Sequence, residues 1–203
     1  MSRRLRRLWG GLAALALAIL SPGASIAGAL RIGSGSELWT IPSAALQRFV
    51  VAGRFSDQRL LRLVASSGWP DEALRAALVK VYAVDLVALA RFLDSPAGRV
   101  FLEQQTRAYR PIPVRAGAQD LRVIALRAAI LTEARGGTIS ALGILQRLPA
   151  PLVIDLSGPP PQRCSSLPCE NPEQCRSVLS WIAFLPACLQ AAAVPGASTA
   201  TAP

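Results

Sequence analysis

The chain has 203 residues, of which 52% are hydrophobic and 17% charged, and this composition predicts one domain with a sizeable core plus appendages. The formal net charge is +10, but four of the 22 basic residues precede position 8, which leaves 18 basic against 12 acidic residues. Those 18 are scattered among few aromatic residues, which argues against nucleic-acid binding, because such proteins gather basic residues on one face.

Residues 1–29 have the pattern of a secretory signal peptide. A basic segment from Ser2 to Trp9 precedes an apolar segment from Gly10 to Leu20, and Ala27-Gly28-Ala29 forms a small-x-small cleavage site. The apolar segment is short for a membrane span of about 20 residues, so we favour cleavage over an uncleaved membrane anchor. The sequence therefore predicts an exported protein, either periplasmic or secreted.

Residues 30–41 are predicted to be a flexible lead-in. Gly33-Ser34-Gly35-Ser36 is similar to a phosphate-binding loop only superficially, because the Gly-Lys-Ser/Thr that completes such a loop does not follow it. An exposed Trp39 or Trp69 within an apolar patch would indicate a protein partner.

Five short helices are predicted between residues 42 and 109, joined by the short loops that are typical of a compact bundle. Each begins at a residue group that favours a helix N-terminus: Pro42-Ser43, Ser56-Asp57, Pro70-Asp71-Glu72, Asp85 and Ser95-Pro96. The side chains predicted to face the core are Leu46, Phe49, Val50, Leu60, Leu61, Val64, Leu74, Ala77, Leu78, Val81, Leu86, Leu89, Phe92, Leu93, Val100 and Phe101.

The longest periodic apolar run of the mature chain lies within residues 116–156. Leu121, Ile124, Ala128 and Leu131 recur at steps of three and four, so we predict that they line the buried face of a long helix. The dipeptide Gly136-Gly137 is predicted to end that helix.

A second helix is expected after the two glycines, with Thr138 as its cap. Its predicted apolar side consists of Ile139, Leu142 and Leu145. Pro149 and Pro151 then end it, and Leu152-Val153-Ile154 is predicted to be a short extended segment.

The composition changes after residue 157. A proline spacer (158–163) precedes a cysteine-bearing tail (164–193), in which residues 179–193 are predicted to form one more helix, and residues 194–203 are predicted to be disordered. The tail holds Cys164, Cys169, Cys175 and Cys188. An even number of cysteines in an exported chain predicts two disulfides, with three pairings open.

Metal and redox alternatives for these cysteines are less favoured, because the sequence has neither a Cys-x-x-Cys motif nor a histidine. The same lack of histidine excludes a Ser-His-Asp or Cys-His hydrolase within these residues, since the imidazole takes the proton of the nucleophile. Lys80 is expected to lie within a helix and point to solvent, and Asp71-Glu72 to start a helix. Glu133, near Arg135 on the long helix, is expected to form a salt bridge. We therefore predict no catalytic, cofactor-binding or metal-binding residue.

Three segments together resemble a known family. They are Phe92 to Leu102, Ala125 to Leu131, and Leu145 to Pro149 continuing into Val153 to Leu156. Their order and spacing resemble an uncharacterised cyanobacterial helical domain that often precedes an α/β-hydrolase module similar to dienelactone hydrolases. The resemblance covers about residues 31–157 and implies no catalytic residue, because the Gly-x-Ser-x-Gly turn of the hydrolase module does not occur in this chain.

The sequence predicts an all-α domain (30–157) of about seven short helices with one short extended segment. The leading functional hypothesis is an exported, non-catalytic interaction module with a protein partner in the cell envelope. The alternatives are an accessory or lid-like subunit of a separate α/β-hydrolase, a helical carrier of an apolar ligand, and an enzyme that uses carboxylates.

Overall fold

The computed structural model describes residues 30–34, 37–111, 119–148, 152–155 and 177–193. The predicted signal peptide (1–29), the proline spacer, Cys164, Cys169, Cys175 and residues 194–203 lie outside the described residues.

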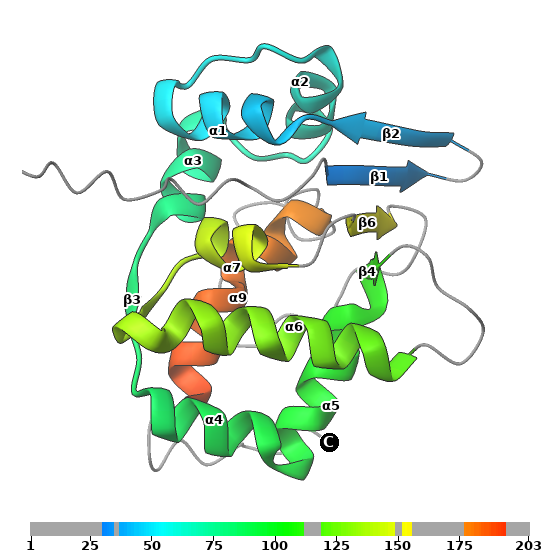
Figure 1. Ribbon diagram of the computed structural model, residues 1–203. Coiled ribbons are helices and arrows are strands. Elements are labelled where there is room, and N and C mark those ends of the chain that lie inside the picture. Colours follow the sequence, from blue (N-terminus) through cyan, green and yellow to red (C-terminus); the bar gives the residue numbers. More distant parts are fainter. Residues whose placement is uncertain (1–29, 35–36, 112–118, 149–151, 156–176, 194–203) are drawn as a thin grey trace, which may run out of the picture.

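Helices make up most of the described chain, so the prediction of a mainly α-helical domain is confirmed (Figure 1). The helices are α1 (Ser43–Ala52), α2 (Gln58–Ala65), α3 (Asp71–Val79), α4 (Leu86–Asp94), α5 (Pro96–Gln105), α6 (Gln119–Glu133), α7 (Ala141–Arg147) and α9 (Val178–Ala193). Two 3-10 turns, Thr106–Ala108 and Ala134–Gly136, follow α5 and α6.

Side-chain caps explain where several helices begin. The Asp57 carboxylate accepts hydrogen bonds from the backbone N–H groups of Arg59 and Leu60 at 2.9 and 3.1 Å. Asp85 accepts one from Ala88 at 2.7 Å, and the Ser95 hydroxyl accepts one from Gly98 at 3.0 Å. Such caps satisfy N–H groups that have no partner within the helix, so these predicted starts are confirmed.

A four-stranded sheet lies along one side of the helices, at the right in Figure 1. It contains β1 (Leu30–Ser34), β2 (Glu37–Ile41), β4 (Tyr109–Pro111) and β6 (Leu152–Asp155), in the order β2-β1-β6-β4. β1 pairs antiparallel with β2 and parallel with β6, and β4 pairs antiparallel with β6. The extended segment predicted at residues 152–154 is therefore confirmed as a strand.

The prediction of a flexible lead-in at residues 30–41 is wrong, because this segment supplies β1 and β2. Gly33 lies within β1 and pairs with Leu38 on β2 and Asp155 on β6, so it belongs to a sheet and not to a phosphate-binding loop. The β1–β2 hairpin is a local feature, whereas the pairing of β1 with β6 joins segments that are far apart in the sequence.

A two-stranded pair, β3 (Tyr82–Ala83) with β5 (Thr138–Ile139), replaces the predicted start of the helix after α6. Gly137 adopts a left-handed φ of 76° and redirects the chain into β5, so Thr138 is not a cap. The cap of α7 is Ser140, whose hydroxyl accepts a hydrogen bond from the Gly143 N–H group at 3.0 Å. Ile139 is buried as predicted, but it lies on a strand.

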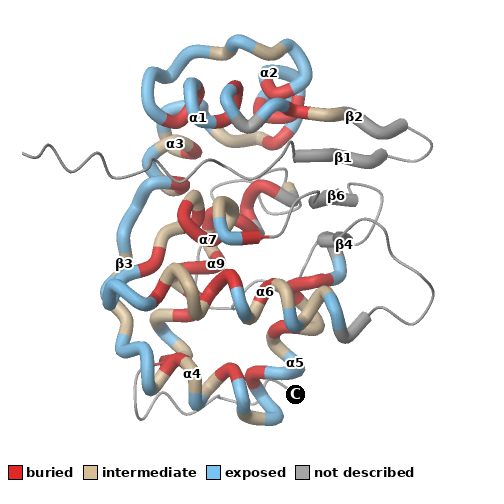
Figure 2. The backbone as a smooth tube through the Cα atoms, in the orientation of Figure 1, coloured by how far each residue is buried: buried red, intermediate tan, exposed pale blue. Residues whose placement is uncertain are grey.

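Helix α9 passes through the middle of the molecule, and burial is concentrated around it (Figures 1 and 2). It packs against α3, α4 and α7. Fully buried side chains from six helices and from the strands β2 and β5 meet in this core: Phe49, Ile41, Leu74, Leu89, Leu102, Leu126, Ile130, Ile139 and Leu189. Although α9 lies beyond the predicted 30–157 domain, it fills that domain's core.

The predicted buried face of α6 is wrong. Leu121 and Ile124 are 57% and 59% exposed, Ala128 is exposed, and Leu131 is half-buried. The residues of α6 and its 3-10 turn that enter the core are Leu126, Ala129, Ile130 and Ala134. The helix carries apolar side chains on two faces, and its packing against α4, α5 and α7 selects one of them.

Four other predicted core residues are exposed: Leu61, Val81, Leu86 and Val100. Each lies on a helix, or next to a strand, whose inner face is already filled by other apolar side chains.

Among the described helices, none combines the length and the apolar character that crossing a membrane would require.

Candidate interaction site

Among the carboxylates that the sequence analysis considered for catalysis, Glu133 lies between two helices and has polar partners on the second. It ends α6 and lies against the start of α7, where the Ser140 hydroxyl donates a hydrogen bond to its Oε1 at 3.3 Å. Arg147 Nε lies 3.6 Å from its Oε2. Gly143 leaves the room for this carboxylate, since a Cβ there would overlap with Oε1. Glu133 therefore joins α6 to α7, and the salt bridge expected for it has Arg147 as its partner.

The other nominated groups also have structural positions. Asp71 and Glu72 lie exposed in the first turn of α3, where a helix dipole favours negative charge. Lys80 is exposed as expected, but it directly follows α3 and does not lie within a helix. No group of three or more potential metal ligands occurs within the described part of the chain.

Trp69 is an internal contact and not an exposed anchor. Its indole N–H donates to the hydroxyl of the fully buried Ser180 at 2.8 Å, and its ring packs on Phe184 with a centroid distance of 5.6 Å. These contacts attach α9 to the segment before α3. Cys188, also on α9, is buried and disulfide-bonded, and the other three cysteines lie outside the described residues.

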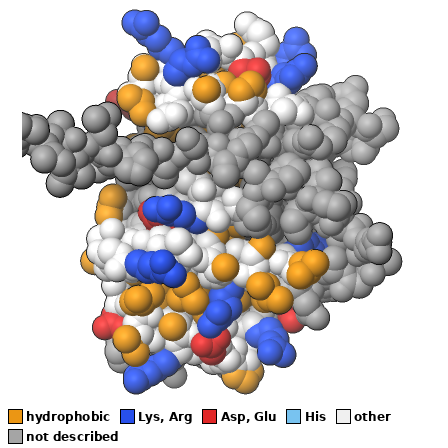
Figure 3. All heavy atoms as spheres, in the orientation of Figure 1, with side chains coloured by type: hydrophobic (Ala, Val, Ile, Leu, Met, Phe, Trp, Pro, Cys, Tyr) orange, Lys and Arg blue, Asp and Glu red, His pale blue; other side chains and the backbone are white. Residues whose placement is uncertain are grey.

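The outer face of α6 is the first candidate site. We define the α6 outer face as Leu121, Ile124 and Ala128, which recur at helical spacing and are all exposed. A hollow of about 300 Å³ between α5 and α6, lined by Arg99, Glu103, Val123 and Ile124, adjoins it. Figure 3 shows apolar side chains gathered over α6 with basic side chains between them.

Two features distinguish this face from scattered surface hydrophobics, which are normal on any protein. First, its residues form one stripe at helical spacing on a single helix, and the opposite stripe of that helix is fully buried. Second, Arg99, which lines the adjoining hollow, and Arg135, which follows α6, are exposed and form no ion pair with a described carboxylate.

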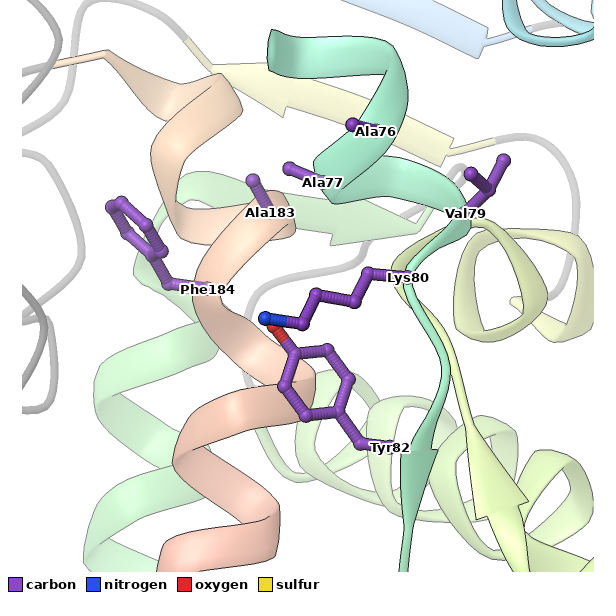
Figure 4. Close-up of a pocket in the computed structure, with 7 residues that line it drawn as sticks. All are labelled: Ala76, Ala77, Val79, Lys80, Tyr82, Ala183 and Phe184. Carbon is purple, nitrogen blue, oxygen red and sulfur yellow. The ribbon is translucent and has the colours of Figure 1, made fainter.

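An open groove between α3, β3 and α9 is the second candidate site (Figure 4). Its volume is about 630 Å³, and it is open to solvent. The residues that line it are Ala76, Ala77, Val79, Lys80, Tyr82, Ala183 and Phe184. The lining is apolar except for the Lys80 amino group and the Tyr82 hydroxyl. The side chain of Lys80 lies over the Tyr82 ring, with its Nζ 5.2 Å from the ring centroid.

Sequence reasoning named some of these residues but assembled neither site. It listed Leu121, Ile124 and Ala128 as one stripe and assigned that stripe to the core. The sequence did not indicate a groove around Lys80. The groove exists because α9 lies beside β3, and that contact joins segments about a hundred residues apart.

One comparison with known proteins gives a match. The model of a family described as "Alpha/beta hydrolase of unknown function (DUF1400)" matches residues 30–155, which run from the start of β1 to the end of β6. No curated protein and no solved structure matches the chain.

Proposed function

The chain belongs to the DUF1400 family, described as alpha/beta hydrolases of unknown function, and from this premise we propose that its helical domain is a non-catalytic module that docks on another protein. The observation that carries the proposal is the α6 outer face. Covering Leu121 and Ile124 would remove from water two large apolar side chains that are each more than half exposed. Burial of apolar surface contributes roughly 25 cal/mol per Å², so this face is a ready source of binding free energy.

The chemistry of the partner follows from the charges around this face. Arg99 lines the hollow beside Ile124 together with Glu103, and Arg135 lies in the 3-10 turn that follows α6, so two guanidinium groups and one carboxylate lie on the elements that border this face. A partner with an apolar centre and carboxylates at its rim would pair with these guanidinium groups, and complementary rim charges mainly determine partner choice and association rate. We further propose an identity for this partner: a separately encoded α/β-hydrolase. The domain would then be an accessory or lid-like subunit.

The non-catalytic part of the proposal is supported by the residues themselves. The family description names a hydrolase, but this sequence has no histidine and no Gly-x-Ser-x-Gly turn from which to build its nucleophile and base. The Glu133 carboxylate already has Ser140 and Arg147 as partners between two helices.

Photocrosslinking in the native host tests the docking proposal. A photoreactive amino acid at position 124 is compared with one at position 51, because Val51 is 73% exposed but lies on α1, away from the face. We expect one discrete protein adduct from position 124, none from position 51, and loss of the adduct when Leu121→Asp is added. The same adducts from both positions would refute the proposal, and a lipid adduct at position 124 would show a membrane-binding face instead.

Turnover assays test the non-catalytic proposal. The purified protein and its Glu133→Gln variant are incubated with p-nitrophenyl esters and glycosides, and product release is followed by absorbance. We expect both to match the buffer blank. Turnover by the wild type that disappears in a folded Glu133→Gln variant would establish an enzyme and overturn this part of the proposal.

We also propose that the domain works outside the cytosol. The signal-peptide pattern of residues 1–29 supports this location, and so does the disulfide at Cys188, because disulfides persist in oxidising compartments. Fusion of alkaline phosphatase to the C-terminus, which is active only after export, is expected to give activity that is lost when residues 1–29 are deleted. Equal activity of the two fusions would contradict export by this segment.

A further inference from the structure

The groove between α3, β3 and α9 is a different surface from the α6 outer face, and nothing in the proposed docking accounts for it. Small methyl side chains of Ala76, Ala77 and Ala183 line it together with the rings of Tyr82 and Phe184 (Figure 4). Its volume of about 630 Å³ falls within the range of roughly 300–1,000 Å³ that is usual for small-molecule sites. The groove therefore offers apolar contact along its length and few polar groups.

Among the described residues that line this groove, Lys80 is the only cation. Lys80 is the only lysine in the chain, and its Nζ lies 5.2 Å from the Tyr82 ring centroid, so the contact with the ring orients it along the groove. Lys80 forms no ion pair with any described carboxylate. Asp85, an acidic residue near β3, lines a neighbouring hollow, and its carboxylate caps α4.

The Tyr82 hydroxyl is the second polar group of the lining. A phenol can donate one hydrogen bond, and a carboxylate can accept bonds from a phenol and an ammonium at the same time. A phosphate site would be expected to contain an arginine fork or several backbone N–H groups, and the described lining has neither. One ammonium beside one phenol suits a group with a single negative charge.

We propose that this groove binds a single-chain fatty-acid anion, with the alkyl chain on the alanine and phenylalanine side chains and the carboxylate at Lys80 and Tyr82. The open groove makes this an exchangeable surface site. It differs from the enclosed cavity that a helical carrier would need.

Isothermal titration calorimetry on the full purified protein tests this assignment, with decanoate, decanol and decyl phosphate as probes. We expect decanoate to bind more tightly than the other two probes. Lys80→Met keeps an unbranched apolar side chain but removes the charge, so it should weaken decanoate binding about two- to fivefold, as for other partly exposed ion pairs. Its affinity for decanol should not change.

Two further variants locate the site. Ala76 is an exposed residue of the lining, so Ala76→Phe should fill the groove without disturbing the core and should weaken both decanoate and decanol. Arg62→Met on α2 removes a charge away from the groove and should change neither affinity. Circular dichroism verifies that all three variants are folded.

The assignment is overturned if decanoate and decanol bind the wild type equally, if neither binds, or if Lys80→Met leaves decanoate binding unchanged. Tighter binding of decyl phosphate than of decanoate would overturn the choice of a carboxylate. Unchanged binding by Ala76→Phe would place the ligand elsewhere. None of these results depends on the α6 outer face, so the two proposals fail independently.

Discussion

Replacing Gly98 by alanine tests how closely α4 and α5 meet. Gly98 is buried in the first turn of α5, directly beneath the carbonyl group of Phe92 at the end of α4. A Cβ on Gly98 would overlap with Phe92 O and would lie 2.7 Å from Phe92 C and 2.8 Å from Leu93 Cα, whereas ordinary contact begins at 3.4 Å. All three of these atoms are backbone atoms, so the clash cannot be relieved by rotating a side chain.

Three contributions determine how Gly98→Ala changes the free energy of unfolding, two unfavourable and one favourable. Overpacking of a well-packed site costs about 1–3 kcal/mol. The shift of Phe92 O would also weaken the hydrogen bond that it accepts from the Ser95 hydroxyl at 2.6 Å, a loss of about 1 kcal/mol. Alanine favours the helix by about 1 kcal/mol over glycine, which offsets part of the loss. We therefore expect Gly98→Ala to lower the free energy of unfolding by about 2 kcal/mol.

Urea and thermal unfolding followed by far-UV circular dichroism measure this effect. A loss of that size should lower the Tm by about 4–8 °C for a chain of this length. The matched control is Gly136→Ala, because a Cβ on Gly136 meets nothing within 4 Å and should leave the Tm nearly unchanged. If Gly98→Ala were as stable as Gly136→Ala, the described approach of α4 to α5 would be refuted.

Three further features are tested by substitution, each with the same unfolding experiment. Ile130→Ala should cost about 2–5 kcal/mol because Ile130 is fully buried, whereas Ile124→Ala on the opposite face should cost about 0.5 kcal/mol or less; equal losses would contradict the orientation of α6. Ser180→Ala should cost about 1 kcal/mol, since it removes the acceptor for the half-buried Trp69 indole, and a neutral effect would count against that hydrogen bond. Asp85→Ala should cost about 1 kcal/mol through loss of the α4 cap, and an unchanged stability would show that the cap is dispensable.

The features that the sequence predicted well are governed by neighbouring residues. A capping side chain and the N–H groups that it satisfies lie within three positions of each other, so Asp57, Asp85 and Ser95 marked helix starts correctly. Gly53 similarly marked the end of α1, where it adopts a left-handed φ of 65°. Local physical chemistry is sufficient for such features.

The features that the sequence did not predict depend on distant contacts. Helical spacing identified the stripe containing Leu121 and Ile124 but could not decide which of two apolar stripes faces inward, and the stripe containing Leu126 and Ile130 prevails because it packs on α4, α5 and α7. The strand β6 was predicted as an extended segment, but its parallel pairing with β1 joins the two ends of the family match and could not be predicted. The groove at Lys80 also requires α9, a helix beyond the family match, to lie beside β3.

The parallel pairing of β1 with β6 has a consequence for biosynthesis. Arg31 on β1 aligns with Val153 on β6. The ribosome therefore completes β1 long before it synthesises β6. At translation rates of about 5–20 residues per second, the wait is on the order of ten seconds. During that time β1 has no β6 to pair with, so its edge is open to hydrogen bonding with other chains. A chaperone that shields this edge until β6 emerges should therefore raise the yield of correctly folded protein.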